Sequence, residues 1–260
     1  MRICTLASSS SGNCTLVSYK DTNILIDAGI SMRRITKSLA AFGLTPEDVS
    51  GILVTHEHSD HIGGIGMMVK HHKTPVLASK VVCREICKAV PGVEDVLSGF
   101  EAGDGFMVGD IPVKSFLTMH DTPESVGYRF DGDATVLFAT DLGSITREIL
   151  DEAKHVDMAI IEANHDVELL KNGAYPYFLK KRILSEHGHL SNDDSGSFAK
   201  ILLESGVRRI VLAHLSRENN TPRLALETVG RQISASGAVV GRDVKLDVAP
   251  PDGMSEVYIM

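Results

Sequence analysis

The chain has few cysteines and no long apolar run. Four cysteines in 260 residues are too few for a disulfide scaffold. Cys83 and Cys87 stand four apart in a helical pattern, with no second pair at zinc-finger spacing, so we interpret them as buried thiols. No run of about 18 apolar residues is present, which excludes a membrane-spanning helix, and the N-terminal segment lacks the charged and apolar regions of a signal peptide. These absences predict a cytoplasmic protein with no membrane partner.

Basic residues are scarce relative to acidic ones. The chain has 26 lysines and arginines against 34 aspartates and glutamates, which gives a formal net charge of −8. This balance argues against a broad basic surface that would hold nucleic acid non-specifically. A nuclease remains compatible with it, because divalent ions would reverse the local field of an active site.

Apolar residues, at 43% of the 260, are numerous enough to bury a full core. No repeat, low-complexity tract or linker divides the chain, so we predict one domain over residues 1–260. Strands that alternate with helices in two comparable halves suit two sheets packed face to face with helices outside, an αββα sandwich of the α/β (α+β) class. The pattern predicts strands near 2–6, 14–19, 23–27, 51–54, 111–118, 124–130, 134–140, 156–161, 209–213, 243–248 and 256–259, and helices near 31–42, 65–73, 145–154, 175–185, 191–204 and 222–236.

The sequence Thr-His-Glu-His-Ser-Asp-His at 55–61 is the most informative segment of the chain. It follows a short run of strand formers and precedes two glycines that allow a tight turn. Side chains two apart in an extended chain point the same way, so His56 and His58 can converge on one ion, while Asp60 and His61 can reach a second. Imidazoles mixed with a carboxylate suit zinc, manganese or iron. The segment predicts a metal site rather than a polar loop.

Three later residues of ligand type stand at the ends of apolar, strand-like runs. They are His120, Asp141 and His214. A two-metal site needs donors from more than one loop, including a bridging carboxylate. One histidine at a strand end is more often structural, but several strand ends that each deliver a ligand type could present them along one edge of a sheet.

The spacing His-x-His-x-Asp-His is that of the metallo-β-lactamase fold, and the chain resembles this superfamily along its whole length. The segments at 6–14, 162–166 and 213–220 resemble the YycJ (WalJ) branch, which is related to ribonuclease Z. The resemblance implies that Asp27 supports the histidine loop without binding metal, and that two divalent ions (zinc, manganese or iron) are bound per chain. It places His56, His58 and His120 on one ion, Asp60, His61 and His214 on the other, and Asp141 between them.

Two residues are candidates for the catalytic chemistry. Asp60 would orient the attacking water as well as bind metal. The sequence His-Gly-His-Leu-Ser resembles a segment of ribonuclease Z whose histidine protonates the leaving oxygen, and His189 is the matching position. His187 is a nearby competitor and His165 a weaker one, and the alternative for His189 itself is a solvent-exposed residue before a helix cap.

Four polar residues are candidates for binding substrate. Ser191 can cap the following helix, with Asp194 completing a capping box, and so aim the positive end of that helix at a phosphate. Arg217 could hold a phosphate bidentately or form an ordinary surface salt bridge. Ser10 and Asn13 lie in a small polar loop that could donate hydrogen bonds to a phosphate or be a plain hairpin.

The resemblance implies a dinuclear phosphodiesterase or nuclease that acts on DNA, with 5′-to-3′ exonuclease action. The alternative is a small-molecule hydrolase for a thioester or lactone, in which the leaving group needs less help from an acid. A regulator without catalysis is a third hypothesis, against which the complete ligand set argues. The sequence has no basic arm that would clamp a long polymer, and it is compatible with an oligomer.

Overall fold

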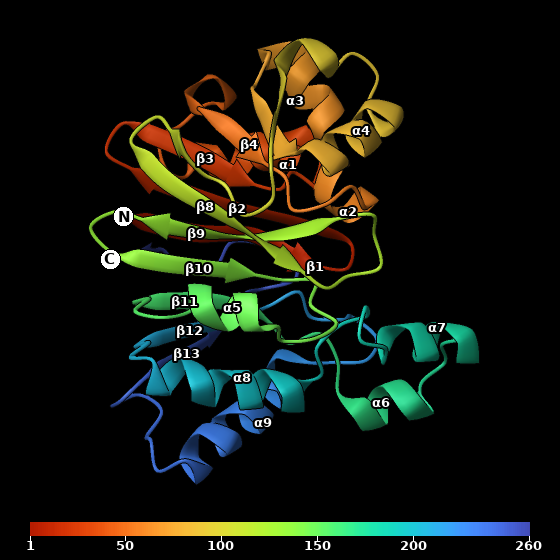
Figure 1. Ribbon diagram of the computed structural model, residues 1–260, viewed down its shortest axis with the longest axis vertical. Helices are drawn as coiled ribbons and strands as arrows, with labels where there is room; N and C mark the ends of the chain where they lie inside the picture. The colour runs from red at the N-terminus through yellow and green to blue at the C-terminus, as the bar shows by residue number, and fades with distance from the viewer.

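The computed structural model describes residues 1–260 and contains two seven-stranded sheets that pack face to face (Figure 1). The first sheet has the strand order β14-β1-β2-β3-β4-β5-β6, and the second has the order β13-β12-β11-β10-β9-β8-β7. The strands of the first sheet are β1 (Arg2–Ser9), β2 (Gly12–Tyr19), β3 (Thr22–Ile26), β4 (Gly51–Leu53), β5 (Val76–Ser79), β6 (Leu97–Phe100) and β14 (Tyr258–Ile259). Those of the second are β7 (Gly105–Val108), β8 (Ile111–Thr118), β9 (Ser125–Asp131), β10 (Thr135–Ala139), β11 (Met158–Glu162), β12 (Arg209–Ala213) and β13 (Lys245–Val248).

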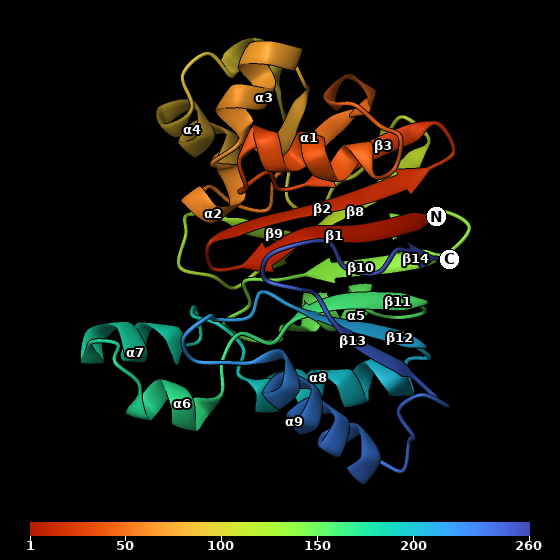
Figure 2. The same ribbon diagram turned by 180° about the vertical axis from the view of Figure 1, so that it is seen from behind.

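Helices cover the outer face of each sheet (Figures 1 and 2). Three apolar clusters form the core: one between the first sheet and its helices, one between the sheets, and one between the second sheet and its helices. This is the predicted αββα sandwich. The helices are α1 (Met32–Ala40), α2 (Ser59–Ile62), α3 (Ile65–His72), α4 (Lys80–Ala89), α5 (Arg147–Glu152), α6 (Val167–Asn172), α7 (Tyr177–Ile183), α8 (Asn192–Glu204) and α9 (Pro222–Ala235), with 3-10 turns at Pro46–Asp48 and Glu94–Val96.

Several short elements were not predicted from the sequence, and the prediction for two thiols was wrong. Strands β5, β6 and β7 have four residues each and helix α6 has six, which is too short for a clear periodic signal. The thiols of Cys83 and Cys87 on α4 are only partly buried, at the edge of the first core cluster, so the prediction of buried thiols is corrected. No helix combines the length and the apolarity that a membrane crossing requires.

The strand directions bring several chain segments to one edge of the molecule. Strands β10, β11 and β12 run parallel, as do β3 and β4, so their carboxyl ends meet at the edge opposite the two termini (Figures 1 and 2). Asp27 and His214 directly follow β3 and β12, Asp141 is the second residue after β10, and the φ angles of the three are 58°, 56° and 57°. Such left-handed backbone is uncommon outside glycine but is tolerated best by Asp, Asn and His.

Candidate metal centre

The histidine loop at 55–61 is held in place by buried carboxylate Asp27. Its Oδ1 accepts a hydrogen bond from the Thr55 N–H at 2.8 Å, and its Oδ2 accepts one from His61 Nδ1 at 2.8 Å. The loop also approaches the backbone of Gly29 so closely that a Cβ there would lie 1.6 Å from the Asp60 carbonyl oxygen. Asp27 therefore supports the loop, as the resemblance implied, and only glycine fits at position 29.

Hydrogen bonds to neighbouring groups determine which ring nitrogen of three histidines faces the centre. His61 Nδ1 is held by Asp27, His120 Nδ1 donates to the Gly188 carbonyl at 3.1 Å, and His214 Nδ1 lies 2.8 Å from Glu162 Oε1. In each case this leaves Nε2 facing the centre. Metal-binding histidines are commonly oriented in this way, by a hydrogen bond at the ring nitrogen that does not bind the metal.

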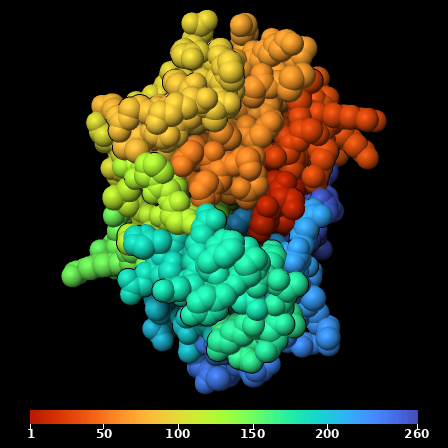
Figure 3. All heavy atoms as spheres, turned by 90° about the vertical axis from the view of Figure 1, so that its right-hand side faces the viewer, coloured from red at the N-terminus to blue at the C-terminus, as the bar shows by residue number.

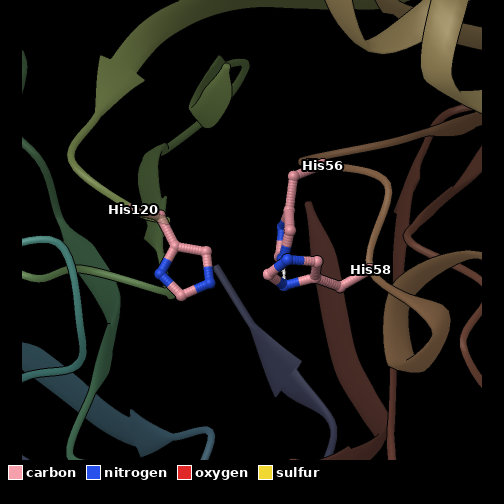
Figure 4. Close-up of side chains that lie close together, drawn as sticks. All are labelled: His56, His58 and His120. Carbon is pink, nitrogen blue, oxygen red and sulfur yellow. Dashed lines mark hydrogen bonds between the residues drawn. The ribbon is translucent and has the colours of Figure 1, made fainter. Parts of the chain in front are cut away.

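The predicted ligands gather in two groups with Asp141 between them. His56 and His58 come from the loop after β4 and His120 from the end of β8; the three point toward one another, and His56 Nε2 lies 3.0 Å from His58 Nδ1 (Figure 4). The oxygens of Asp141 lie 3.4 Å from His61 Nε2 and 3.8 Å from His120 Nε2. Four overlapping groups have possible ligand atoms within 4.8 Å of one another, and two of these are the predicted sets: His56, His58 and His120, and Asp60, His61 and His214. The other two groups contain Asp141, one with His56 and His61 and one with Glu162, His189 and His214.

This arrangement fits divalent cations. Asp141 Oδ2 and His214 Nε2 are buried and make no hydrogen bond, which is costly for polar atoms that have no other partner. Burial would lower the pKa of His214, but Asp141, Asp60 and Glu162 outweigh it and raise that pKa to about 10. The carboxylates thus make the site strongly attractive to positive charge, and a metal ion would satisfy the unpaired atoms.

Glu162, at the end of β11, is a site residue to which the sequence motifs assign no role. Its Oε1 lies 2.8 Å from the Nδ1 atoms of both His189 and His214, and its Oε2 accepts hydrogen bonds from the N–H groups of Leu142 and Leu190. Burial would raise the pKa of Glu162, but the contacts with His189 and His214 hold it well below its usual range. Glu162 is therefore an anion that links the metal centre to His189.

His189 lies at the rim of the centre, where its side chain is 20% exposed. Glu162 holds its Nδ1, and its Nε2 makes no hydrogen bond. The ring lies 5.0 Å from that of His120 and borders a cavity of about 160 Å³. Of the two other candidates for the acid that protonates the leaving oxygen, His187 is exposed, whereas His165 is buried and makes no side-chain hydrogen bond. The cavity is also lined by Ser10, Asp121, Asn164, Tyr175, Leu179, Arg182, Ile183, Gly188 and Ser216.

The structure places two of the four substrate-binding candidates beside the centre. Ser10 is exposed in the turn between β1 and β2 and lines the cavity. Asn13 Nδ2 lies 3.1 Å from His61 Nε2 and 3.3 Å from Asp60 Oδ2, so it touches predicted ligands rather than open space.

The other two candidates are engaged elsewhere. Ser191 is the N-cap of α8 and forms the expected capping box with Asp194, which leaves its hydroxyl donating to the Asp194 carboxylate at 2.6 Å. Arg217 forms an ion pair with Asp252 at 2.5 Å, which is the surface salt bridge considered as the alternative to phosphate binding. Arg217 does not line the cavity. Contacts of Ser191 and Arg217 with a phosphate stay predictions.

The burial of His165 makes stability depend on pH. Burial lowers the pKa of His165 to about 4, although Glu162 nearby favours its charged form, whereas an unfolded chain has a histidine pKa of about 6.5. Between these values the unfolded state binds the proton and the folded state does not, so stability is full above pH 6.5 and is lost as the pH falls toward 4. At pH 5 the loss is about 2 kcal/mol.

We therefore expect His165→Phe, which cannot titrate, to lose less stability than the wild type between pH 7.5 and pH 5. The difference in the fall of the melting temperature should be roughly 4–8 °C by calorimetry. The histidines of the metal centre titrate in both proteins and cancel in the comparison. Parallel falls would contradict a depressed pKa for His165.

Comparison with known proteins identifies the family. The sequence model described as "Beta-lactamase superfamily domain" matches residues 22–215. Exodeoxyribonuclease WalJ of Streptococcus pneumoniae serotype 2 (strain D39 / NCTC 7466) is 38% identical over 251 residues, which cover 95% of this chain and 93% of that protein. Exodeoxyribonuclease YycJ of Bacillus anthracis is 35% identical over 248 residues, with coverage of 95% and 94%. The metallo-beta-lactamase fold protein YhfI of Bacillus subtilis has a similar fold, with a TM-score of 0.73 over 98% of both chains at 15% identity. The chain therefore belongs to the beta-lactamase superfamily and, within it, to the family of the WalJ and YycJ exodeoxyribonucleases.

Proposed function

We propose that this chain is a metal-dependent exonuclease that hydrolyses the phosphodiester bonds of DNA in the cytoplasm. The observation that carries the proposal is His189, held by Glu162 at 2.8 Å and facing a cavity beside the metal centre. The names of the two relatives support DNA as the substrate. The four cysteines are free, in keeping with a reducing compartment.

Two divalent ions would occupy the centre, one in each ligand group. When bound, such ions lower the pKa of water and neutralise charge that develops on a phosphate. Asp141, whose oxygens lie near ligands of both groups, would be shared between them. Zinc, manganese and iron all accept this mixture of imidazole and carboxylate.

The residues around the centre would handle the leaving group. His189 Nδ1–H donates to Glu162, which fixes the orientation of the ring and leaves Nε2 to face the cavity. A protonated Nε2 can give its proton to the departing oxygen of the sugar, which is otherwise a poor leaving group. Ser10, which also lines the cavity, can donate a hydrogen bond to the phosphate.

Metal-saturated protein should contain close to two equivalents of divalent metal per chain. Asp141→Ala should contain less, because Asp141 lies between the two groups and its Oδ2 has no other hydrogen-bonding partner. Elemental analysis after removal of free metal checks both statements. A protein that takes up one ion, and no second at any metal concentration, would rule out the dinuclear centre.

An activity screen tests the function itself. The substrates are end-labelled DNA, RNA, bis(p-nitrophenyl) phosphate and a thioester, each with zinc and with manganese. We expect degradation of DNA from one end, with the 5′ end as the start that the family resemblance implies. Cleavage of the thioester with no cleavage of any phosphodiester would favour the small-molecule hydrolase instead.

A further inference from the structure

Two short helices stand apart from the sheets and from the helices that cover them. Residues 167–184, with α6 and α7, form an arm at the end of the molecule where the strands deliver the metal ligands (Figures 1 and 2). The chain termini lie at the opposite end. Seen from the side of the arm, its green and teal residues project beneath the orange and red segments of the N-terminal half (Figure 3).

The arm is basic, although the chain as a whole carries a net charge of −8. Between Glu168 and Glu186 it has four basic residues and no acidic one. Two of the four have structural partners: Lys180 donates to the carbonyls of Lys171 and Gly173, and Arg182 pairs with Asp121. The remaining two are Lys171, which reaches Glu168 at 3.5 Å, and Lys181, which is exposed and forms no ion pair.

The arm also carries two exposed aromatic side chains. Tyr177 is 82% exposed and Phe178 is 73% exposed, and the other strongly exposed large apolar side chains of the protein are all aliphatic or methionine. On helix α7 each ring is followed four residues later by a cation: Lys181 follows Tyr177, and Arg182 follows Phe178. This spacing places the ring and the cation of each pair on the same face of the helix. Lys171, Tyr177, Lys180, Lys181, Leu184 and Ser185 surround a shallow hollow of about 420 Å³.

The arm adjoins the cavity of the metal centre. Tyr175, Leu179 and Arg182 line that cavity together with His189. Asp121, the partner of Arg182, directly follows the predicted ligand His120. A polymer that lay on the arm would therefore continue into the cavity in which His189 acts.

We propose that the arm binds the single-stranded part of a DNA substrate, which rests on the nuclease function proposed above. Unpaired bases stack on Tyr177 and Phe178, and phosphates contact Lys181 and Lys171. Stacking on aromatic rings contributes about 1–3 kcal/mol per base and requires bases whose faces are free, which a duplex does not offer. No basic arm is evident in the sequence because its cations are few and come from two helices.

Binding of fluorescein-labelled oligonucleotides, followed by anisotropy, tests the proposal. Asp60→Ala serves as the parent protein, so that the probe stays intact. A 20-nucleotide oligo(dT) should bind at least about tenfold more weakly when Tyr177→Ala and Phe178→Ala are added, the effect of losing one to two stacked bases. Binding of a blunt duplex should change little. Ile259→Ala, 76% exposed at the opposite end, is the matched control and should have no effect.

A second pair of variants isolates the charge. Lys181→Glu and Lys245→Glu change the net charge equally, but exposed Lys245 lies on β13 next to the start of β12, away from the centre. Only Lys181→Glu should weaken binding and flatten its dependence on salt. Equal effects of the two lysine variants would overturn the proposal. An affinity for oligo(dT) that does not change when Tyr177 and Phe178 are replaced by alanine would also overturn it.

The two proposals fail in distinguishable ways. Hydrolysis of bis(p-nitrophenyl) phosphate and DNA by the wild type, with binding unaffected by the arm variants, would refute the arm alone. Binding of oligo(dT) that depends on Tyr177 and Phe178, in a wild type that hydrolyses no phosphodiester, would refute the nuclease and leave the arm as a binding surface.

Discussion

Asp60→Ala should abolish phosphodiester hydrolysis, with a loss of at least about 10³-fold in kcat. Asp60 Oδ2 lies 3.4 Å from His61 Nε2 and 3.6 Å from His214 Nε2, so its carboxylate belongs to the second ligand group. Burial would raise the pKa of Asp60, but His61 and His214 hold it well below the usual range, which keeps it anionic at every working pH. Its loss removes a metal ligand and the group that would orient the attacking water.

The matched control is Glu57→Ala, which removes a carboxylate from the same loop. Glu57 accepts a hydrogen bond from Thr122 and belongs to neither ligand group, so activity should stay within a few-fold of the wild type. Both variants need circular dichroism and metal analysis beside the kinetics. Near-normal turnover by a folded, metal-replete Asp60→Ala protein would contradict the catalytic role.

The candidate ligands could be placed at strand ends from the sequence because they follow a rule of sheet geometry. His120, Asp141 and His214 each come after an apolar run, and the structure turns these runs into β8, β10 and β12 of one sheet. Residues at corresponding strand ends meet at one edge whatever the loops between them do. The same rule, applied to the apolar run before Glu162, also predicts Glu162 as a residue of the site.

Other features depend on contacts between distant segments, which no local pattern contains. Arg217 meets Asp252, 35 residues away, and this ion pair removes the guanidinium from the cavity. The arm collects its cations from two helices, of which α6 was not predicted at all. Gly29 lies just after a predicted strand, but its closeness to the Asp60 carbonyl follows only from the packing of two loops.

His189→Ala should slow the hydrolysis of a nucleotide phosphodiester by about 10²–10⁴-fold, the usual contribution of a positioned acid. The alkoxide of a nucleotide sugar leaves poorly unless it receives a proton, whereas p-nitrophenolate leaves with little help. The same variant should therefore hydrolyse bis(p-nitrophenyl) phosphate at close to the wild-type rate. His189 is near Asp141, Glu162 and His214, but its Nδ1 is held by Glu162 and it is not one of the seven predicted ligands, so the metal content should not change.

The matched control is His187→Ala, two residues earlier and exposed, which should be active on both substrates. A nucleotide-specific loss in His187→Ala instead of His189→Ala would move the acid to His187. Equal slowing of both substrates by His189→Ala would mean that His189 positions the substrate or the fold, because a missing acid cannot slow a reaction that needs none. A fall in metal content would make His189 a ligand, which its distance of 3.8 Å from Asp141 would then permit. Only the substrate-dependent loss with unchanged metal identifies Nε2 of His189 as the proton donor.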